Sequence, residues 1–302
     1  MRAFQFVSLC IVAAALLGGC AKAPTARPIV ANSYVAVTPA PPVVQQSAAA
    51  LAIRPAPLRD RIFAPGHLAG RTLAVASNAD LALAPGEVIL TFDDGPRPGK
   101  TDAILDILDQ FGVKATFMML GNAAAAHPDL VRTVAARGHT IGNHSYDHAN
   151  LSGLTSQAAL DDVVKGERAI TRALAGSGQT LAPFFRFPYL AQTGFLRTNM
   201  RQGGMVILDV DIDSKDYYTD TPAQVAARTL SRLEARGSGI ILFHDIHART
   251  VAMLPDFLQQ LEDRGYSVVR LVPRDPSVFG RDIITAKAPV EAAVETELES
   301  PD

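Results

Sequence analysis

From Glu87 onward, short apolar runs alternate with segments whose apolar residues recur every three or four positions. Runs of four to eight residues rich in Val, Ile and Phe predict buried strands, and the longer period predicts helices that cover them. Seven runs have strand character: Val88–Phe92, Ala115–Leu120, His139–Asn143, Phe184–Phe187, Met205–Ile212, Gly239–His244 and Tyr266–Leu271.

The helical segments between these runs carry recognisable start and stop signals. Thr101 is the predicted N-cap of a helix that continues to Phe111. Pro128 stands in the first turn of the next helix, which Gly138 ends. Three more helices are predicted over Ser156–Ala175, from a Thr221–Gln224 capping box to Arg236, and over Leu254–Arg264.

Strands that are apolar on both faces and separated by helices predict a parallel sheet covered on both sides. A closed barrel of the standard kind needs about eight strand–helix units. Seven units therefore predict an α/β fold in the form of a distorted (β/α)7 barrel, with an open doubly wound sheet as the alternative.

The ends of the chain differ from this pattern. Residues 1–19 form a predicted signal peptide that leads to Leu17-Gly18-Gly19-Cys20, which resembles a lipobox, so Cys20 is the expected site of lipidation. An ordinary secretory signal is the alternative. Residues 20–57 are rich in Ala and Pro and predict a flexible tether, 58–84 a lead-in segment without an assigned role, 85–275 the catalytic domain, and 276–302 an acidic, disordered tail.

Composition narrows the class of protein. With 302 residues and 48% hydrophobic residues the chain can bury one large core, and a net charge of −2 gives no sign of a nucleic-acid partner. The only cysteines are Cys10, inside the signal peptide, and Cys20, so no disulfide is expected in the mature domain. The chain is expected to be exported to the cell envelope, and protein partners cannot be deduced.

Polar motifs follow five of the predicted strands. They are TFDDGP at Thr91–Pro96, HSYDH at His144–His148, RFPY at Arg186–Tyr189, DSKDY at Asp213–Tyr217 and LFH at Leu242–His244. The carboxyl ends of parallel strands meet at one edge of a barrel or open sheet, which is where such folds keep their active sites. Two adjacent carboxylates, a His pair, an Arg and a further Asp and His are a complete set for metal-assisted hydrolysis.

The His pair has the spacing of metal ligands. His144 and His148 are four residues apart, so a helical turn would place both imidazoles on one face. Two imidazoles and a carboxylate form a facial triad that leaves positions open for water and substrate. Zn²⁺ is the first choice for such donors, and Co²⁺, Ni²⁺, Mn²⁺ and Fe²⁺ also fit.

In this order the five motifs resemble those of the polysaccharide deacetylases, carbohydrate esterase family 4 with its NodB-homology domain, over roughly 85–273. The resemblance implies that Asp94, His144 and His148 bind the metal and that Asp93 is the general base. It further implies that Arg186 pairs with Asp93, keeping it ionised and oriented, and that the backbone N–H of Tyr189 contributes to the oxyanion hole.

The last two motifs complete the implied site. By the resemblance, His244 is the general acid and Asp216 is its hydrogen-bond partner, while Leu242 lines the pocket for the acetyl methyl group. Tyr217 stands where the family often has Trp and walls the cleft. Other acidic and His residues near the motifs are expected to lie at solvated strand ends or on the rim: Asp209, Asp211, Asp213, Asp245 and His247.

The expected function is hydrolysis of N-acetyl groups on an amino-sugar polymer or oligomer such as peptidoglycan, a chitin-like glycan or poly-N-acetylglucosamine. Two alternatives remain at this point: an O-acetyl esterase acting on xylan or another acetylated glycan, and a non-catalytic glycan-binding envelope lipoprotein. Because Ala21 and not Asp follows Cys20, resemblance to known sorting rules favours the outer membrane in an organism with two membranes.

Overall fold

The computed structural model describes residues 68–274. The expected signal peptide with Cys20, the tether, the first part of the lead-in segment (58–67) and the acidic tail lie outside the described residues. Within 68–274, no helix is both long enough and apolar enough to cross a membrane.

Seven parallel strands form a distorted ring, and the fold is the expected α/β barrel of seven strands. They are β2 (Glu87–Asp93), β3 (Thr116–Met119), β4 (Thr140–Asn143), β5 (Phe184–Phe185), β6 (Val206–Ile207), β7 (Ile212–Asp213) and β8 (Gly239–His244). Successive strands pair with each other, and β8 pairs with β2 to close the ring. Of the seven ring strands, only the consecutive pair β6 and β7 is not joined, and this break is the distortion.

The run over Met205–Ile212 was predicted as one strand and is two. Asp209 and Asp211 in its middle are exposed and form ion pairs with Arg197 and Arg236. Charged side chains that point to solvent cannot continue a strand buried on both faces, so the chain leaves the ring between β6 and β7.

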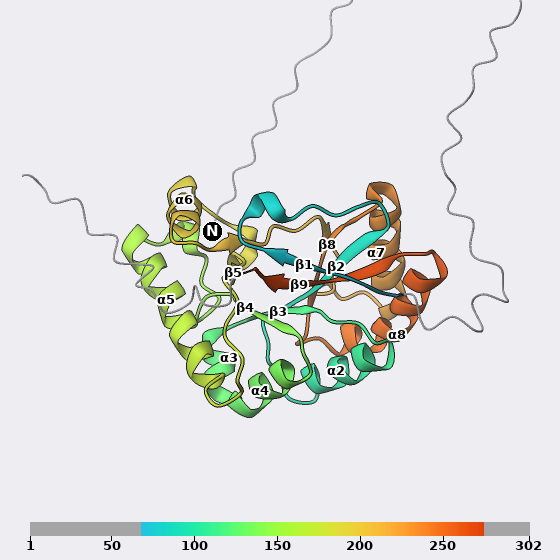
Figure 1. The fold of residues 1–302 in the computed structure, drawn as a ribbon, viewed down its shortest axis with the longest axis horizontal. Coiled ribbons are helices and arrows are strands. Elements are labelled where there is room, and N and C mark those ends of the chain that lie inside the picture. The colour runs from blue at the N-terminus through green and yellow to red at the C-terminus, as the bar shows by residue number, and fades with distance from the viewer. Residues whose placement is uncertain (1–67, 275–302) are drawn as a thin grey trace, which may run out of the picture. The chain divides into compact units, whose positions relative to one another are not determined.

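Two further strands lie outside the ring. β1 (Ala69–Val75) and β9 (Ser267–Pro273) pair with each other in parallel, and β9 pairs with the ring only at the first two residues of β2. In Figure 1 these two strands lie across the middle of the ring. The run over Tyr266–Leu271 is therefore a strand, as predicted, but it does not supply the seventh position of the barrel.

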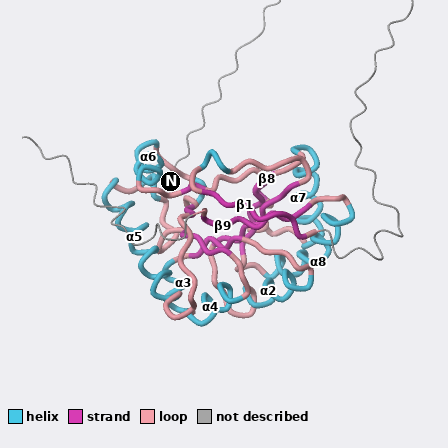
Figure 2. Tube along the Cα trace, viewed as in Figure 1, coloured by secondary structure: helices cyan, strands magenta, loops and turns pink. Residues whose placement is uncertain are grey.

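Seven α-helices surround the described sheet, as Figure 2 shows, with the helices at the periphery and the strands at the centre. They are α2 (Thr101–Gln110), α3 (Gly121–Ala126), α4 (Pro128–Ala136), α5 (Ser156–Ala173), α6 (Gly194–Gln202), α7 (Pro222–Arg236) and α8 (Ala248–Asp263). The predicted Thr221–Gln224 capping box is confirmed at the start of α7, and Pro128 begins α4 as predicted.

Some helix predictions were wrong or incomplete. Helices α3 and α6 were not predicted. Thr101 is the first residue of α2 rather than its N-cap. Helix α8 begins six residues before the predicted start and contains Pro255. Its buried stripe, which includes Met253, Leu254 and Phe257, stabilises the helix enough to offset the hydrogen bond that the proline removes.

Strand alternation determines which residues point into the ring. Phe92 stacks on Phe243, which contacts Phe257 of α8, so these rings face the helices. Their neighbours Asp93 and His244 must then point inward. Toward the amino ends of the strands the interior is apolar and includes Ile89, Ile240 and residues of β9. Toward the carboxyl ends of the strands it carries the motif side chains.

Candidate active site

The structure brings the five motifs to one end of the barrel. They follow the carboxyl ends of β2, β4, β5, β7 and β8, so all five lie on the rim expected from the sequence. Asp93 and His244 are partners in the register between β2 and β8, which places the two reactive groups on adjacent strands. The rest of the site is built around this pair.

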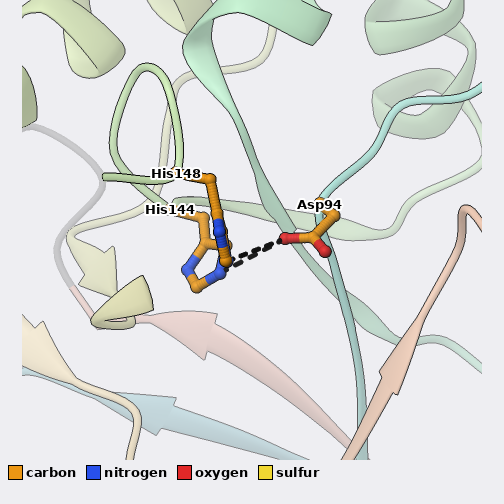
Figure 3. Close-up of side chains that lie close together, drawn as sticks. All are labelled: Asp94, His144 and His148. Atoms are coloured by element: carbon orange, nitrogen blue, oxygen red, sulfur yellow. Dashed lines mark ion pairs between the residues drawn. The ribbon is translucent and has the colours of Figure 1, made fainter. Parts of the chain in front are cut away.

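Asp94, His144 and His148 form the cluster that can hold a metal ion (Figure 3). Oδ1 of Asp94 lies 3.5 Å from Nε2 of His144 and 3.4 Å from Nε2 of His148. Each residue offers one ligand atom, and these atoms all lie within 4.8 Å of one another. Oδ1 of Asp94 is buried without a hydrogen-bond partner among the described residues, as fits an atom whose partner is a cation.

The local chemistry prepares both imidazoles as ligands. The carbonyl of Arg186 lies 2.8 Å from Nδ1 of His144 and accepts its proton, which leaves Nε2 with a free lone pair. Burial lowers the pKa of His148, and Asp94 opposes this only in part, so the ring is neutral at neutral pH. Two imidazoles and one carboxylate fit a divalent cation such as Zn²⁺.

The His pair does not sit on a helical turn, which corrects the sequence interpretation. The HSYDH segment is an irregular loop in which Ser145 and His148 have φ of 73° and 60°. Asn143 accepts a hydrogen bond from the backbone of Ser145 at 2.9 Å, and Asp162 accepts one from Tyr146 at 2.8 Å. Side-chain hydrogen bonds, not helix periodicity, therefore bring the two rings to 5.1 Å between centroids.

Asp93 is held by a buried ion pair. Nη1 of Arg186 donates to Oδ1 of Asp93 at 2.7 Å and to the hydroxyl of Thr91 at 2.7 Å. Nε of Arg186 donates to the carbonyl of Leu208 at 2.9 Å. Arg186 is 1% exposed and Asp93 is 2% exposed, so the carboxylate has little freedom to turn away from the site. Its other oxygen lies 3.7 Å from Nε2 of His144, beside the metal cluster.

The buried Asp216 and the partly buried His244 form a second pair. Oδ1 of Asp216 accepts from Nδ1 of His244 at 2.6 Å, and Oδ2 accepts from the His244 backbone and the Thr250 hydroxyl at 2.8 and 2.6 Å. Burial lowers the pKa of His244, but the hydrogen bond and charge of Asp216, with Asp93 and Asp94, raise it to about 9. His244 is therefore protonated at neutral pH in the metal-free protein.

Aromatic side chains border the site. Tyr189 is 67% exposed and meets the His148 ring edge-on at 4.4 Å, whereas Tyr217 is 42% exposed and stands at 90° to the His244 ring at 5.5 Å. Leu242 lies inside the ring on β8 and is buried. The exposed large hydrophobic residues of 68–274 all follow strand ends on this face: Leu154, Tyr189, Leu190, Phe195, Tyr217 and Tyr218.

Asp245 was expected on the rim and is fully buried instead. Oδ2 of Asp245 accepts from the Thr101 hydroxyl at 2.6 Å, and a Cβ on Gly95 would come within 2.1 Å of that oxygen. Burial raises the pKa of Asp245 to about 7 despite the Thr101 hydrogen bond. The Asp245 side chain packs against Gly95 and so supports the turn that follows Asp94. An Asp after a strand end looks solvent-exposed in sequence, so no sequence signal marks this residue.

Comparison with known proteins shows that the chain is similar to polysaccharide deacetylases. The family model for polysaccharide deacetylase matches residues 82–208, which include the first three motifs. The chain is 32% identical over 184 residues to a peptidoglycan-N-acetylglucosamine deacetylase of Listeria monocytogenes, covering 61% of this chain but only 38% of that protein. It is 34% identical over 215 residues to a chitin deacetylase of Colletotrichum lindemuthianum, covering 67% of this chain and 84% of that protein.

A solved structure has the same fold. A peptidoglycan deacetylase from Bdellovibrio bacteriovorus superposes with a TM-score of 0.65 at 35% identity, covering 74% of this chain and 65% of that one.

Proposed function

The chain belongs to the polysaccharide deacetylase family, and we propose that it is a metal-dependent hydrolase that removes N-acetyl groups from an amino-sugar polymer or oligomer. One observation carries the proposal. Asp93 and His244 lie side by side in register on β2 and β8, each held by a buried partner of opposite charge, next to a cluster of one carboxylate and two imidazoles.

Asp94, His144 and His148 would hold the divalent ion, for which we propose Zn²⁺. When bound, this ion would polarise the acetyl carbonyl and make the attacking water more acidic. The residues of the chain supply the remaining chemistry, and they are already positioned for it by the hydrogen bonds described above.

We assign the proton transfers to the two ion pairs. Asp93, oriented by Arg186, takes the proton of the attacking water. The backbone N–H of Tyr189 donates to the developing oxyanion. His244 gives its proton to the departing amine as the C–N bond breaks, which releases acetate and a free amino sugar. Asp216 keeps the imidazole oriented and protonated for this step.

Acetate release by the purified protein tests the proposal, after chelation and again with Zn²⁺ restored. The substrates are N-acetylglucosamine oligomers, peptidoglycan fragments and acetylated xylan. We expect Zn²⁺-dependent release from the N-acetylated glycans. Release from xylan alone would favour the esterase alternative, and metal binding without release from any substrate would favour a glycan-binding role.

We also propose that the protein acts at the cell envelope, anchored by lipid on Cys20 after removal of residues 1–19. The apolar segment ending in Leu17-Gly18-Gly19-Cys20 supports this proposal. Incorporation of radiolabelled palmitate in the producing bacterium is the test. We expect label in the wild-type chain and none in Cys20→Ala, and an unlabelled wild type would point to an ordinary secretory signal.

A further inference from the structure

Lys215 has an unusual backbone and no part in the proposed reaction. Its φ is 54°, the left-handed region that glycine adopts without strain and lysine does not. It lies between Asp213, the last residue of β7, and Asp216, the partner of His244. A glycine here would avoid the strain but would lack the contacts that the lysine side chain makes.

The side chain closes a triangle of hydrogen bonds with Asp213 and Tyr217. Nζ of Lys215 donates to Oδ2 of Asp213 and to the Tyr217 hydroxyl, each at 3.0 Å. The Tyr217 hydroxyl donates to the same Oδ2 at 3.0 Å. These bonds raise the pKa of Lys215, so the ammonium stays charged across the working range.

The triangle is fixed to the barrel. The backbone N–H of Lys215 donates to Oδ1 of Asp213 at 2.9 Å, so both oxygens of this carboxylate are engaged. Asp213 pairs in register with Leu242 of β8, and its carbonyl accepts a hydrogen bond from Arg232. Asp213 was expected at a solvated strand end, but it is half-buried and connects the loop to the sheet.

The hydroxyl contacts fix the direction of the Tyr217 ring. The ring is 42% exposed and stands at 90° to the His244 imidazole and at 86° to the Tyr218 ring. A tyrosine this exposed would otherwise rotate about its side-chain bonds. Because both hydrogen-bond partners of its hydroxyl, the donor Lys215 and the acceptor Asp213, are anchored, the ring presents one fixed apolar surface next to the general acid.

We propose that Lys215 is a positioning residue that, with Asp213, holds Tyr217 as a rigid wall for the sugar ring at the site of reaction. The inference rests on the proposed function, because it takes the occupant of the rim to be a sugar. We call this hydrogen-bonded triangle of Lys215, Asp213 and Tyr217 the clamp. The Tyr217 ring would contact the substrate both before and during the reaction, so loss of the clamp should weaken substrate binding more than turnover.

Steady-state kinetics on N-acetylglucosamine oligomers test this, with Lys215→Met as the main variant and Tyr217→Phe as the variant that keeps the ring without its hydroxyl. We expect each to raise KM by about 3- to 10-fold, the effect of losing a net hydrogen bond, with kcat within about 2-fold. The double variant should be no worse than either single one, because both break the same clamp.

Two controls separate positioning from general damage. Lys215→Gly relieves the backbone strain, so we expect an unchanged or higher melting temperature together with the raised KM. Lys114→Ala removes a surface lysine that pairs with Asp109 at 2.8 Å far from the motif loops, and it should leave KM unchanged. The alkaline limb of the pH profile should not move in the Lys215 variants, because the Asp216–His244 pair is intact.

A crystal structure of Lys215→Met gives a readout that needs no turnover. We expect the Tyr217 ring in more than one orientation, where the wild type has one. A single wild-type orientation in the variant, or an unchanged KM, would overturn the clamp. If the wild type releases no acetate from any substrate, the proposed function fails, and the crystal structure still decides whether Lys215 holds Tyr217.

Discussion

The two ends of the barrel both contain residues with a left-handed backbone conformation, but the types of residue differ between the ends. Where helices return to strands, away from the motifs, the left-handed backbone positions belong to glycine, as at Gly138 and Gly237. At the motif end, six non-glycine residues adopt positive φ, and within 68–274 these are all such residues: Asp94, Ser145, His148, Tyr189, Leu190 and Lys215. Two of them are proposed metal ligands.

The two ends also differ in whether their arginine–aspartate ion pairs are exposed or buried. Near the ends of α2 and α4, Arg137 pairs with Asp106 at 2.6 Å in solvent, whereas at the motif end Arg186 and Asp93 are paired and buried. Strain and buried charge both cost stability, and both are concentrated where the chemistry needs particular side chains. The rest of the barrel has to stabilise the motif end.

The largest expected effect comes from removing a proposed metal ligand. His148→Ala should weaken metal binding by more than the roughly 10- to 100-fold that is typical of losing an outer partner, and should abolish acetate release. Titration calorimetry with Zn²⁺ measures the first and acetate assay the second. His127→Ala, a half-buried His outside the motif loops, is the matched control. Equal zinc affinity in both variants would contradict the assignment.

The second effect compares the two arginine pairs. Arg186→Met leaves Asp93 buried without its partner and should cost about 3–5 kcal/mol of unfolding free energy. Arg137→Ala breaks an exposed pair and should cost less than about 1 kcal/mol. Urea denaturation measures both. The double variant Arg186→Met, Asp93→Asn removes both charges and should recover part of the loss, and similar losses at the two ends would break the comparison.

The third effect concerns pH. Asp216→Asn removes the group that holds the pKa of His244 at about 9, and burial then lowers that pKa. We expect the alkaline limb of kcat/KM to move to lower pH by more than about one unit. If the alkaline limb of kcat/KM in Asp216→Asn stays at the wild-type pH, His244 is not the general acid.

The raised pKa of His244 also affects stability in the metal-free wild type. It stabilises the folded state below about pH 6.5, and this stabilisation is lost as pH rises through about 9.

The smallest effect isolates backbone strain. A Cβ at Gly237 would meet no atom within 4 Å, so Gly237→Ala reports only the cost of its φ of 88°, about 1–2 kcal/mol. Leu190→Gly should have the opposite sign, because it relieves a φ of 55° at a 43% exposed side chain. Melting temperatures measure both, and a destabilised Leu190→Gly variant would show that this loop is not strained.

The sequence allowed the fold class and the motif rim to be predicted because both depend on local patterns. Long strands such as β2 and β8 show their burial directly, and the Thr221–Gln224 capping box marks the start of α7. The motif residues could be located because each follows an apolar run.

Features that depend on distant contacts could not be predicted. β1 is a strand only because β9, far along the chain, pairs with it. The two-residue strands β5, β6 and β7 are too short to show any alternation of their own. The burial of Asp245 depends on which loops meet above the ring, as its contact with Thr101 shows, and neighbouring residues in sequence carry no sign of that.

The central claim is that one residue cluster binds the metal and a different carboxylate performs the proton transfer. Metal content and acetate release, measured together in the wild type and in Asp93→Asn, test it most directly. We expect about one divalent ion per chain in both proteins, from the single described cluster, and acetate release from N-acetylglucosamine oligomers in the wild type alone. Wild-type turnover in Asp93→Asn, or release by fully chelated wild type, would contradict the claim.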